Sequence, residues 1–515
     1  MSDAKTDTDV LIVGGGPVGL TIAIGLRRFG VDCVLVERHP STLDFPKGRR
    51  VNVRTMEIFR QWGLEDDVVA TALPAADSLF VFRGDTLLAD EYARMSLGTL
   101  DTPFSPTEEV VCSQEYLEPI LMQKAQEAGV DIRFETRLTE FQQDADGVVA
   151  RLSELDDDRV SDVRARFMIA ADGARGQTRD RLGITDTTAG VMGERVSIRF
   201  VSELADRVAD RLAGLYLLGQ PRPGSNIATI DNSKQWLLML PRDAEAEPEE
   251  SFTAERLDEL AAAAIGDPEV EFSVSGHRFW TAIARSADRF TAGNVILAGD
   301  AAHQTTPVGG LGMNCGIGDA HNLVWKVAGV VQGWAEPAVV ETYDAERKPV
   351  VDWTVQASLG AAMPPKTLDG LVLGATYESA AIIADGTDAP PKEDPLSDFV
   401  PSARPGSRAA HVWIEVDGER QSTLDLWGEW FTLLVGPASS DAAVEFASSV
   451  TAPLRTHVVG GPHVIDPDGE LARTYELAER GAVLVRPDGY VAWRTTDMSA
   501  EDARSALRTA TGASA

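Results

Sequence analysis

Two glycine-rich segments, far apart in the chain, carry the residue types that bind nucleotides. The first, VLIVGGGPVGL, runs from Val10 to Leu20 and places Gly14, Gly16 and Gly19 in a G-x-G-x-x-G pattern. The glycines of this pattern permit a tight turn, close approach of a pyrophosphate to the backbone, and close packing of a helix on a strand. The helix N-terminus that follows attracts the phosphates. The segment therefore predicts a nucleotide-binding loop.

The stretches around this loop have the order of a strand–helix–strand unit. TDVLIV predicts a strand, the residues after Gly16 predict a helix that ends near Gly30, and VDCVLVE predicts a second strand that ends at Glu37. A carboxylate at this position accepts hydrogen bonds from the ribose hydroxyls of an adenosine. An acid rather than a basic residue favours an unphosphorylated ribose, as in FAD or NAD.

The second segment, LAGDAAHQTTPVGGLGMNCGIGDA, runs from Leu297 to Ala320. It predicts a strand ending at Asp300, a glycine-rich loop, and a helix. Its spacing fits neither a second G-x-G-x-x-G loop nor a P-loop. A carboxylate at the strand end suits a polyol hydroxyl, and a loop leading into a helix N-terminus offers N–H groups to a negatively charged ring edge. One FAD, with its adenosine at the first segment and its ribityl chain and flavin ring at the second, accounts for both.

The composition narrows the classes of partner. The 515 residues are too many for one hydrophobic core, so we expect two or three domains. The formal net charge of −33 argues against nucleic acid and anionic membrane surfaces. No apolar run reaches the roughly 20 residues of a membrane span, and the start does not look like a signal peptide. The three cysteines, Cys33, Cys112 and Cys315, form no CxxC pair. They indicate buried thiols in a reducing cytoplasm, with no disulfide framework and no metal site.

Several motifs together resemble one family. They are GGGPVGL, Glu37, RTMEIFRQWGLED (Arg54–Asp66), AADGARGQTR (Ala170–Arg179), the segment from Leu297 to Val327, and ETYDAERKPV (Glu341–Val350). In this order they resemble the single-component (class A) FAD-dependent aromatic hydroxylases, the relatives of para-hydroxybenzoate hydroxylase and phenol hydroxylase. The resemblance extends as far as Val350. The tail beyond the linker is similar to that of the phenol hydroxylase and polyketide hydroxylase branches.

The resemblance implies a role for individual residues. The residues expected to bind cofactor are Gly14, Gly16, Pro17 and Gly19 at the pyrophosphate, Glu37 and Arg38 at the adenosine, Lys47, Arg49 and Gln114 near FAD, Asp172 and Gly173 for FAD and the nicotinamide cofactor, Asp300 at the ribityl chain, and Pro307, Gly310, Gly312, Met313 and Asn314 at the flavin ring.

Only Arg49 and Pro307 are candidates for contact with the reacting atoms, because the chemistry belongs to the flavin. The family gives His303 no role as a base, so we expect it to be packed or hydrogen-bonded.

The sequence departs from the family pattern at two places. Gly176 stands where the family's Asp-Gly motif usually continues to a serine, which weakens any argument about a side-chain contact there. The basic residue ahead of Arg54 is split between Lys47 and Arg49. Which of the two approaches the flavin stays open, and a solvated basic face is the alternative for both.

The expected fold class is α/β, or α+β overall. We expect a Rossmann-like FAD-binding domain from residues 1–182 and 283–370, an inserted β-sheet substrate domain at 183–282, a linker at 371–405, and a thioredoxin-like C-terminal domain at 406–515. The tail has no cysteine, which excludes thiol–disulfide exchange and leaves a structural or dimer-forming part. Tyr216, Trp236 and Met239 are candidate walls of the substrate pocket, with core packing as the alternative.

The resemblance implies a specific reaction. NADPH or NADH reduces FAD, O2 forms a flavin C4a-hydroperoxide, and its distal oxygen hydroxylates a phenolic or polycyclic aromatic substrate. The sequence has no second dinucleotide loop, which fits a nicotinamide cofactor that docks transiently. A dry pocket is needed because a solvated hydroperoxide collapses to hydrogen peroxide.

Two other functions remain open from the sequence. One keeps the cofactor but carries out Baeyer–Villiger, epoxidising or drug-inactivating chemistry. The other is a flavin-binding protein without turnover. A halogenase is disfavoured because the chain has no Trp-x-Trp pair. We expect a cytoplasmic enzyme with a small-molecule partner and no nucleic-acid or membrane partner; homodimer formation is left open.

Overall fold

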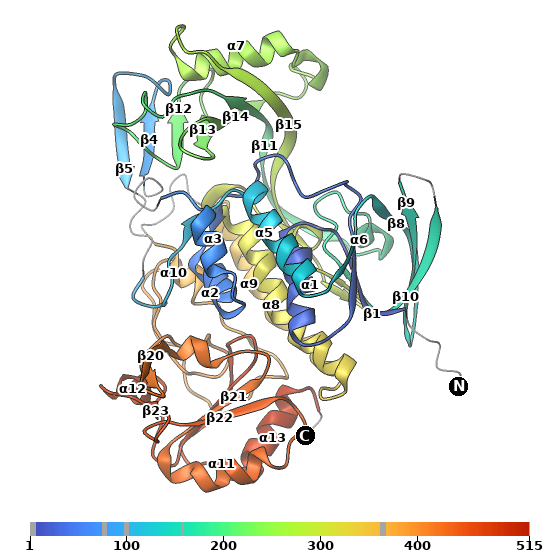
Figure 1. The fold of residues 1–515 in the computed structure, drawn as a ribbon, viewed down its shortest axis with the longest axis vertical. Coiled ribbons are helices and arrows are strands. Elements are labelled where there is room, and N and C mark those ends of the chain that lie inside the picture. Colours follow the sequence, from blue (N-terminus) through green and yellow to red (C-terminus); the bar gives the residue numbers. More distant parts are fainter. Residues whose placement is uncertain (1–6, 75–79, 97–101, 156–158, 361–366, 514–515) are drawn as a thin grey trace.

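The computed structural model describes residues 7–74, 80–96, 102–155, 159–360 and 367–513. Three bodies follow one another along the long axis (Figure 1). A sheet capped by a helix lies at the top, a sheet with long helices lies in the middle, and the C-terminal part of the chain lies at the bottom. This mixed α/β architecture is the expected fold class.

The middle body is built on a mainly parallel sheet. Its strand order is β16 (Thr291–Ala292), β17 (Val295–Leu297), β10 (Val160–Ala170), β1 (Thr8–Val13), β2 (Cys33–Val36) and β7 (Asp131–Arg133), with β8 (Thr136–Asp144) and β9 (Gly147–Glu154) extending β10. The strands from β17 to β7 are parallel, and the apolar residues of β1 and β2 are buried, as a sheet covered on both faces requires. Ligands of such sheets bind beyond the carboxyl ends of the strands, where the loops after β1, β10 and β17 meet.

Helices pack around this sheet and against one another. The long ones are α1 (Pro17–Arg28), α5 (Gln114–Glu127), α8 (Leu311–Gln332) and α9 (Ala338–Ala357); shorter ones are α2 (Val53–Gln61), α3 (Glu65–Thr71), α6 (Thr178–Arg181) and α10 (Asp369–Val372). The small ladder β3 (Arg50–Val51) and β6 (Val110–Val111) lies beside α2. Helix α1 follows the first glycine-rich loop and contacts both α5 and α8. Both predicted loop–helix units therefore share one core.

The upper body is an eight-stranded sheet, called here the substrate sheet. Its order is β18 (His303–Gln304), β15 (Ser273–Ala287), β11 (Asp186–Val201), β14 (Gln235–Arg242), β13 (Ser225–Thr229), β12 (Leu215–Leu218), β4 (Phe80–Gly84) and β5 (Tyr92–Ser96). Two parts lie outside the range 183–282: the β4–β5 hairpin comes from much earlier in the chain, and β18 comes from the loop after Asp300. Helix α7 (Ala254–Ile265) packs on the outer face.

The C-terminal body has two sheets. The larger has the order β22 (Leu454–Val458), β21 (Phe431–Val435), β24 (Ala482–Val485) and β25 (Val491–Thr495), with helices α11 (Ser440–Ala447) and α13 (Ala500–Ala510). The smaller consists of β20 (Glu419–Ser422), β19 (Trp413–Val416) and β23 (Val464–Ile465), followed by α12 (Glu470–Thr474). Strands β21 and β22 are parallel and joined by α11, and antiparallel β24 and β25 lead into α13. This βαβ–ββα order is that of the thioredoxin-like fold.

The segment expected as a linker, residues 371–405, is packed against the rest of the chain near both of its ends. Leu373, Tyr377 and Ala403 are buried, and the Tyr377 ring stacks on Tyr490 with their centroids 3.9 Å apart. This segment thus ties the helices of the middle body to the C-terminal body.

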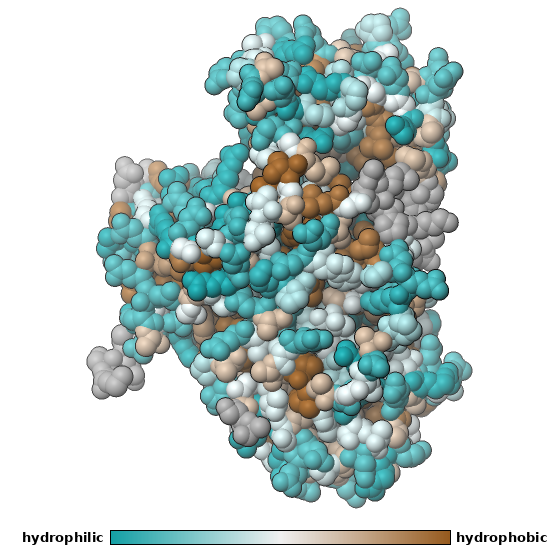
Figure 2. All heavy atoms as spheres, turned by 180° about the vertical axis from the view of Figure 1, so that it is seen from behind, coloured by the Kyte–Doolittle hydropathy of each residue, from teal (hydrophilic) through white to brown (hydrophobic). Residues whose placement is uncertain are grey.

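The surface is polar over most of the view from behind (Figure 2). Apolar side chains gather on it where the upper body meets the middle body. Within the described part of the chain, no helix combines the length and apolar character needed to cross a bilayer.

Candidate functional site

The first glycine-rich loop combines two packed glycines with one that faces open space. Gly14 has φ +113°, and a β-carbon there would overlap the carbonyl oxygen of Ala171; a β-carbon at Gly19 would overlap the carbonyl oxygen of Gly14. Gly16 is different, because no atom lies within 4 Å of its would-be β-carbon. It caps the N-terminus of α1, followed by Pro17 in the first turn. The loop therefore leaves space for an anion in front of the helix dipole.

Glu37 is held in position by the backbone of the same loop. Its Oε2 accepts a hydrogen bond from the Gly15 N–H at 2.7 Å, and its Oε1 accepts one from the His39 N–H at 2.9 Å. The carboxylate keeps further lone pairs for a ligand's hydroxyls. Arg38, next to it, is exposed, and its charge acts to lower the pKa of Asp172.

Asp172 follows β10 and has one satisfied and one unsatisfied oxygen. Its Oδ2 accepts hydrogen bonds from the Thr178 N–H at 3.2 Å and the Thr178 hydroxyl at 2.9 Å. Its Oδ1 is buried and has no partner among the described residues. Burial raises the pKa of this carboxyl, against the effect of the Thr178 hydrogen bonds. A buried acceptor without a partner is costly, so a ligand hydroxyl would satisfy it. Gly173, with φ +77°, makes the turn that follows.

Gly176 is required by this arrangement. A β-carbon there would overlap the carboxyl group of Asp172, so the usual serine would force the Asp172 side chain away from Thr178. We expect Gly176→Ser to weaken FAD binding about tenfold, since hydrogen bonds to a charged group contribute about 1.5–3 kcal/mol. FAD titration by fluorescence quenching measures the change. Thr178→Val removes the same support and should act in the same direction; unchanged affinity in both variants would contradict this role.

Lys47, rather than Arg49, lies beside Asp300. The Lys47 Nζ is 3.1 Å from Asp300 Oδ2. The Asp300 carboxylate raises the pKa of Lys47. Burial acts to raise the pKa of Asp300. The Lys47 ammonium acts against burial, and the pKa of this carboxyl lies below its ordinary value. The Lys47 side chain is 65% exposed, so it can move aside for a ligand. The pair presents a cation and an acceptor at the place predicted for the ribityl chain.

Arg49 points toward the substrate sheet. Its Nη1 donates hydrogen bonds to the carbonyl oxygens of Gly214 at 2.9 Å and Thr229 at 2.8 Å. Burial lowers the pKa of this guanidinium to about 10, and no carboxylate counteracts the shift. Arg49 thus connects the loop beside the cofactor site to the sheet above it.

Gln114 forms hydrogen bonds with Gly48, the residue between Lys47 and Arg49. Its backbone N–H donates to the Gly48 carbonyl oxygen at 2.8 Å, its Oε1 accepts from the Gly48 N–H at 3.2 Å, and its Nε2 donates to Glu118 at 2.7 Å. Gln114 therefore fixes the loop that carries Lys47 and Arg49.

The second glycine-rich loop turns sharply before α8. Gly309 and Gly310 have φ of +77° and +63°, Pro307 is exposed, and the position of Gly312 lies against Thr305. The Met313 side chain lies beside Gly48, which brings the two cofactor loops together.

Asn314 uses its side chain for structure. Its Oδ1 accepts from the Asn52 N–H at 2.9 Å, and its Nδ2 donates to the carbonyl oxygens of Arg50 at 2.8 Å and Gly310 at 2.7 Å. Any contact of Asn314 with the flavin therefore falls to its backbone.

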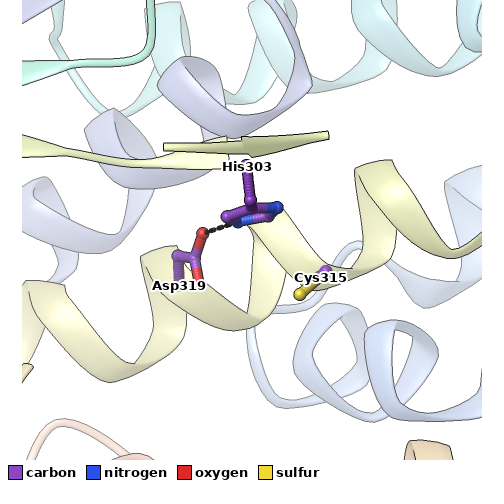
Figure 3. A group of neighbouring side chains, drawn as sticks. All are labelled: His303, Cys315 and Asp319. Atoms are coloured by element: carbon purple, nitrogen blue, oxygen red, sulfur yellow. Dashed lines mark hydrogen bonds and ion pairs between the residues drawn. The ribbon is translucent and has the colours of Figure 1, made fainter. Parts of the chain in front are cut away.

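A buried cluster supports the turn that carries Asp300 (Figure 3). His303 Nε2 and Asp319 Oδ2 are 2.7 Å apart, and Asp319 also accepts from the Gly299 N–H at 3.0 Å and from Arg347 Nε at 2.8 Å. Sequence reasoning missed Asp319 and Arg347. The signal for Asp319 was the polar GDAHN stretch on α8, and the signal for Arg347 was the polar DAERK stretch on α9. His303 is hydrogen-bonded rather than free to act as a base.

Cys315 completes a group of ligand-type side chains with His303 and Asp319, all within 4.8 Å of one another. The guanidinium of Arg347 contacts both Asp319 and the Cys315 sulfur. Burial raises the pKa of the Cys315 thiol to about 12. A protonated thiol and an arginine oppose a metal cation here.

The substrate candidates fall on opposite faces of the sheet. Tyr216 and Trp236 lie in the core under α7, where Trp236 Nε1 donates to the Ser202 carbonyl oxygen at 3.1 Å. Core packing, which the sequence also allowed, is what both residues show, because strand alternation turns them to the outer face. Met239 lies on the other face, packed with Phe45 of the cofactor-side loop.

These features fit FAD in this chain. The open space at Gly16 suits the pyrophosphate, Glu37 the ribose, and the Lys47–Asp300 pair the ribityl chain. The unsatisfied Asp172 oxygen suits a further hydroxyl.

Comparison with known proteins gives the same picture. Residues 7–358 match the model of an FAD binding domain, and residues 402–514 match that of the C-terminal part of aromatic-ring hydroxylases. Tetracenomycin B2 monooxygenase-dioxygenase of Streptomyces olivaceus is 37% identical, covering 98% of each chain. Aklavinone 12-hydroxylase RdmE of Streptomyces purpurascens is 35% identical, covering 97% of each.

Two solved structures are similar over nearly the whole chain. The flavin-dependent monooxygenase PieE, in complex with FAD and substrate, has a TM-score of 0.89 at 31% identity, covering 98% of this chain and 99% of the other. A ternary complex of aklavinone-11 hydroxylase with FAD and aklavinone has a TM-score of 0.88 at 33% identity, with the same coverage.

Proposed function

Since this chain belongs to the family of FAD-dependent aromatic-ring hydroxylases, we propose that it hydroxylates a phenolic ring of a multi-ring, polyketide-type substrate. Bound FAD supplies the redox and oxygen-activating chemistry, taking electrons from NADPH or NADH and passing one atom of O2 to the ring. The observation that carries the proposal is the similarity, over nearly the full length, to aklavinone-11 hydroxylase with bound FAD and aklavinone and to a flavin-dependent monooxygenase with bound FAD and substrate.

The residues of this chain bind, orient and exclude water. The backbone around Gly16 binds the pyrophosphate, Glu37 the ribose, and Asp300 with Lys47 the ribityl chain. Arg49 holds the substrate sheet over the cofactor loops through Gly214 and Thr229, which keeps water from the reacting atoms. Met239 faces the space between sheet and cofactor.

The test is a substrate panel with the purified enzyme. We expect a yellow protein whose NADPH or NADH oxidation and O2 uptake accelerate with a polycyclic phenol, giving a product that carries one additional oxygen atom. Hydrogen peroxide measured alongside reports uncoupled turnover. A lactone or epoxide product would replace this proposal with Baeyer–Villiger or epoxidising chemistry. A yellow protein that no aromatic compound stimulates would indicate flavin binding without turnover.

We place this reaction in the cytoplasm. The three described cysteines are free thiols, and Cys33 and Cys112 are buried, which suits a reducing compartment.

A further inference from the structure

The face of the substrate sheet turned toward the middle body, called here the inner face, carries an unusual guanidinium. On β11 the side chains of Val196, Ile198 and Phe200 pack on the outer face with α7. Alternation therefore turns Arg195, Ser197 and Arg199 to the inner face. The hydrogen bond from Trp280 Nε1 to Ser197 Oγ, at 2.9 Å, places Trp280 there as well.

Arg195 and Trp280 both lie on this inner face. They are directly opposite each other on β11 and β15. Phe45, from the loop on the cofactor side, packs at Gly276 and Arg278, which precede this pair on β15. Further along the strand, Ala284 and Ala287 are buried in the core of the middle body. The pair lies between these two contacts.

Among the described residues, no carboxylate pairs with Arg195. Its one hydrogen bond among the described residues runs from Nη1 to the Gly224 carbonyl oxygen, at 3.3 Å. Its side chain is partly buried, and desolvation lowers the pKa of the guanidinium with no acidic group acting against it. Other arginines of the same sheet do have carboxylates. Arg199 pairs with Glu115, and Arg242, on the outer face, pairs with Glu194.

The absence of a partner is notable in a chain with 80 acidic and 47 basic residues. A partly desolvated guanidinium without a counter-charge destabilises the protein unless an anion binds to it. Its planar set of donors matches a carboxylate or another delocalised oxyanion.

Arg49 is a second guanidinium without a carboxylate partner among the described residues. Arg49 binds the carbonyl of Thr229 at the end of β13, whereas Arg195 binds that of Gly224, just before this strand begins. At a rise of about 3.3 Å per residue over five residues, the two carbonyls lie roughly 16 Å apart. A fused multi-ring molecule can lie between them.

We propose that the aromatic substrate carries a carboxylate, which binds Arg195 on the inner face of the sheet, away from Arg49. Trp280 provides an aromatic surface beside that group. The inference rests on the proposed function and specifies its substrate class.

The experiment compares the FAD-loaded enzyme with two probes, a polycyclic phenolic carboxylic acid and its methyl ester. Binding is measured from the change in flavin absorbance, and hydroxylation is measured separately. We expect the wild type to bind the acid at least tenfold more tightly than the ester. In Arg195→Met we expect the Kd of the acid to rise about 10- to 100-fold, while the Kd and kcat of the ester stay within twofold.

Two further variants separate binding from structure. Arg195→Lys keeps the charge without the planar fork, so we expect it to restore part of the preference for the acid. Arg256→Met removes an arginine from α7, on the other side of the sheet, and should leave the preference unchanged. Equal loss for acid and ester in Arg195→Met, or a wild type without preference, would overturn the inference. If the acid binds preferentially but neither probe is hydroxylated, the proposed function fails and the anion site stands.

Discussion

A valine at position 16 is expected to leave the chain folded but colourless. Gly16 has φ −77°, which any residue adopts, and no protein atom lies within 4 Å of its would-be β-carbon. The added side chain would instead fill the space in front of α1, where the FAD pyrophosphate needs close contact with the backbone. We therefore expect Gly16→Val to purify without FAD and to lose at least about 100-fold in NADPH-dependent hydroxylation, as each 1.4 kcal/mol of lost binding is tenfold.

Two other glycines provide the comparison. Gly360→Ala adds a β-carbon in ordinary contact with its neighbours and should leave FAD content and activity unchanged. Gly19→Ala would overlap the Gly14 carbonyl oxygen and should reduce stability itself. Circular dichroism, thermal unfolding and the FAD-to-protein ratio separate the three. A yellow Gly16→Val enzyme with wild-type activity would refute the assignment of the first loop.

Glu346→Ala is expected to have the largest effect on stability. Glu346 lies on α9 and is fully buried, with Lys326 Nζ at 2.7 Å and the two terminal nitrogens of Arg486 at 2.6 and 2.8 Å. Removing it leaves a lysine and an arginine buried without this carboxylate. Breaking a buried ion pair in this way costs about 3–5 kcal/mol. We expect a clear fall in Tm and in the denaturant midpoint. Glu341→Ala, at an exposed position of the same helix, is the matched control.

The effect should depend on pH in a defined direction. Burial acts to raise the pKa of Glu346, but Arg486 and Lys326 outweigh it, so its folded pKa lies below the ordinary value of 4.5. A depressed carboxyl pKa stabilises the fold above that ordinary value and ceases to do so as the pH falls toward the folded pKa. The stability difference between wild type and Glu346→Ala should therefore be full near neutral pH and narrow below pH 4.5. A difference independent of pH would show that lost packing, rather than charge, is responsible.

The sequence was sufficient for the elements that have strong local signals. The strand at Thr8–Val13, the helix that follows Gly16, and the acid at Glu37 lie as predicted, because the glycine pattern and hydrophobic period are local properties of the chain. The strand before Asp300 and the long helix after the second loop were found for the same reason.

What the sequence could not supply depends on pairing between distant segments. The face of Tyr216 and Trp236 depends on strand register, and a shift of one residue exchanges the two faces. The β4–β5 hairpin joins the substrate sheet through β12, a pairing that no local pattern encodes. The sequence could not tell which of Lys47 and Arg49 lies beside Asp300, because Asp300 and the carbonyls of the substrate sheet that bind Arg49 are far away in the chain. The same holds for Asp319, whose partners come from two other segments, the turn with Gly299 and His303 and helix α9.

The buried contacts of the C-terminal body have a consequence for engineering. Arg486 meets Glu346 on α9, and Phe431 packs edge-on against Trp325 of α8, with ring centroids 5.6 Å apart. Helix α8 begins at the second glycine-rich loop, so the C-terminal body supports the helix that follows the loop proposed to bind the flavin. Truncation after residue 405 would remove that support and expose apolar rings to water. The C-terminal body is thus part of the structure that supports α8 and α9. Exchange of this body between relatives would succeed only if Arg486 and Phe431 are both kept.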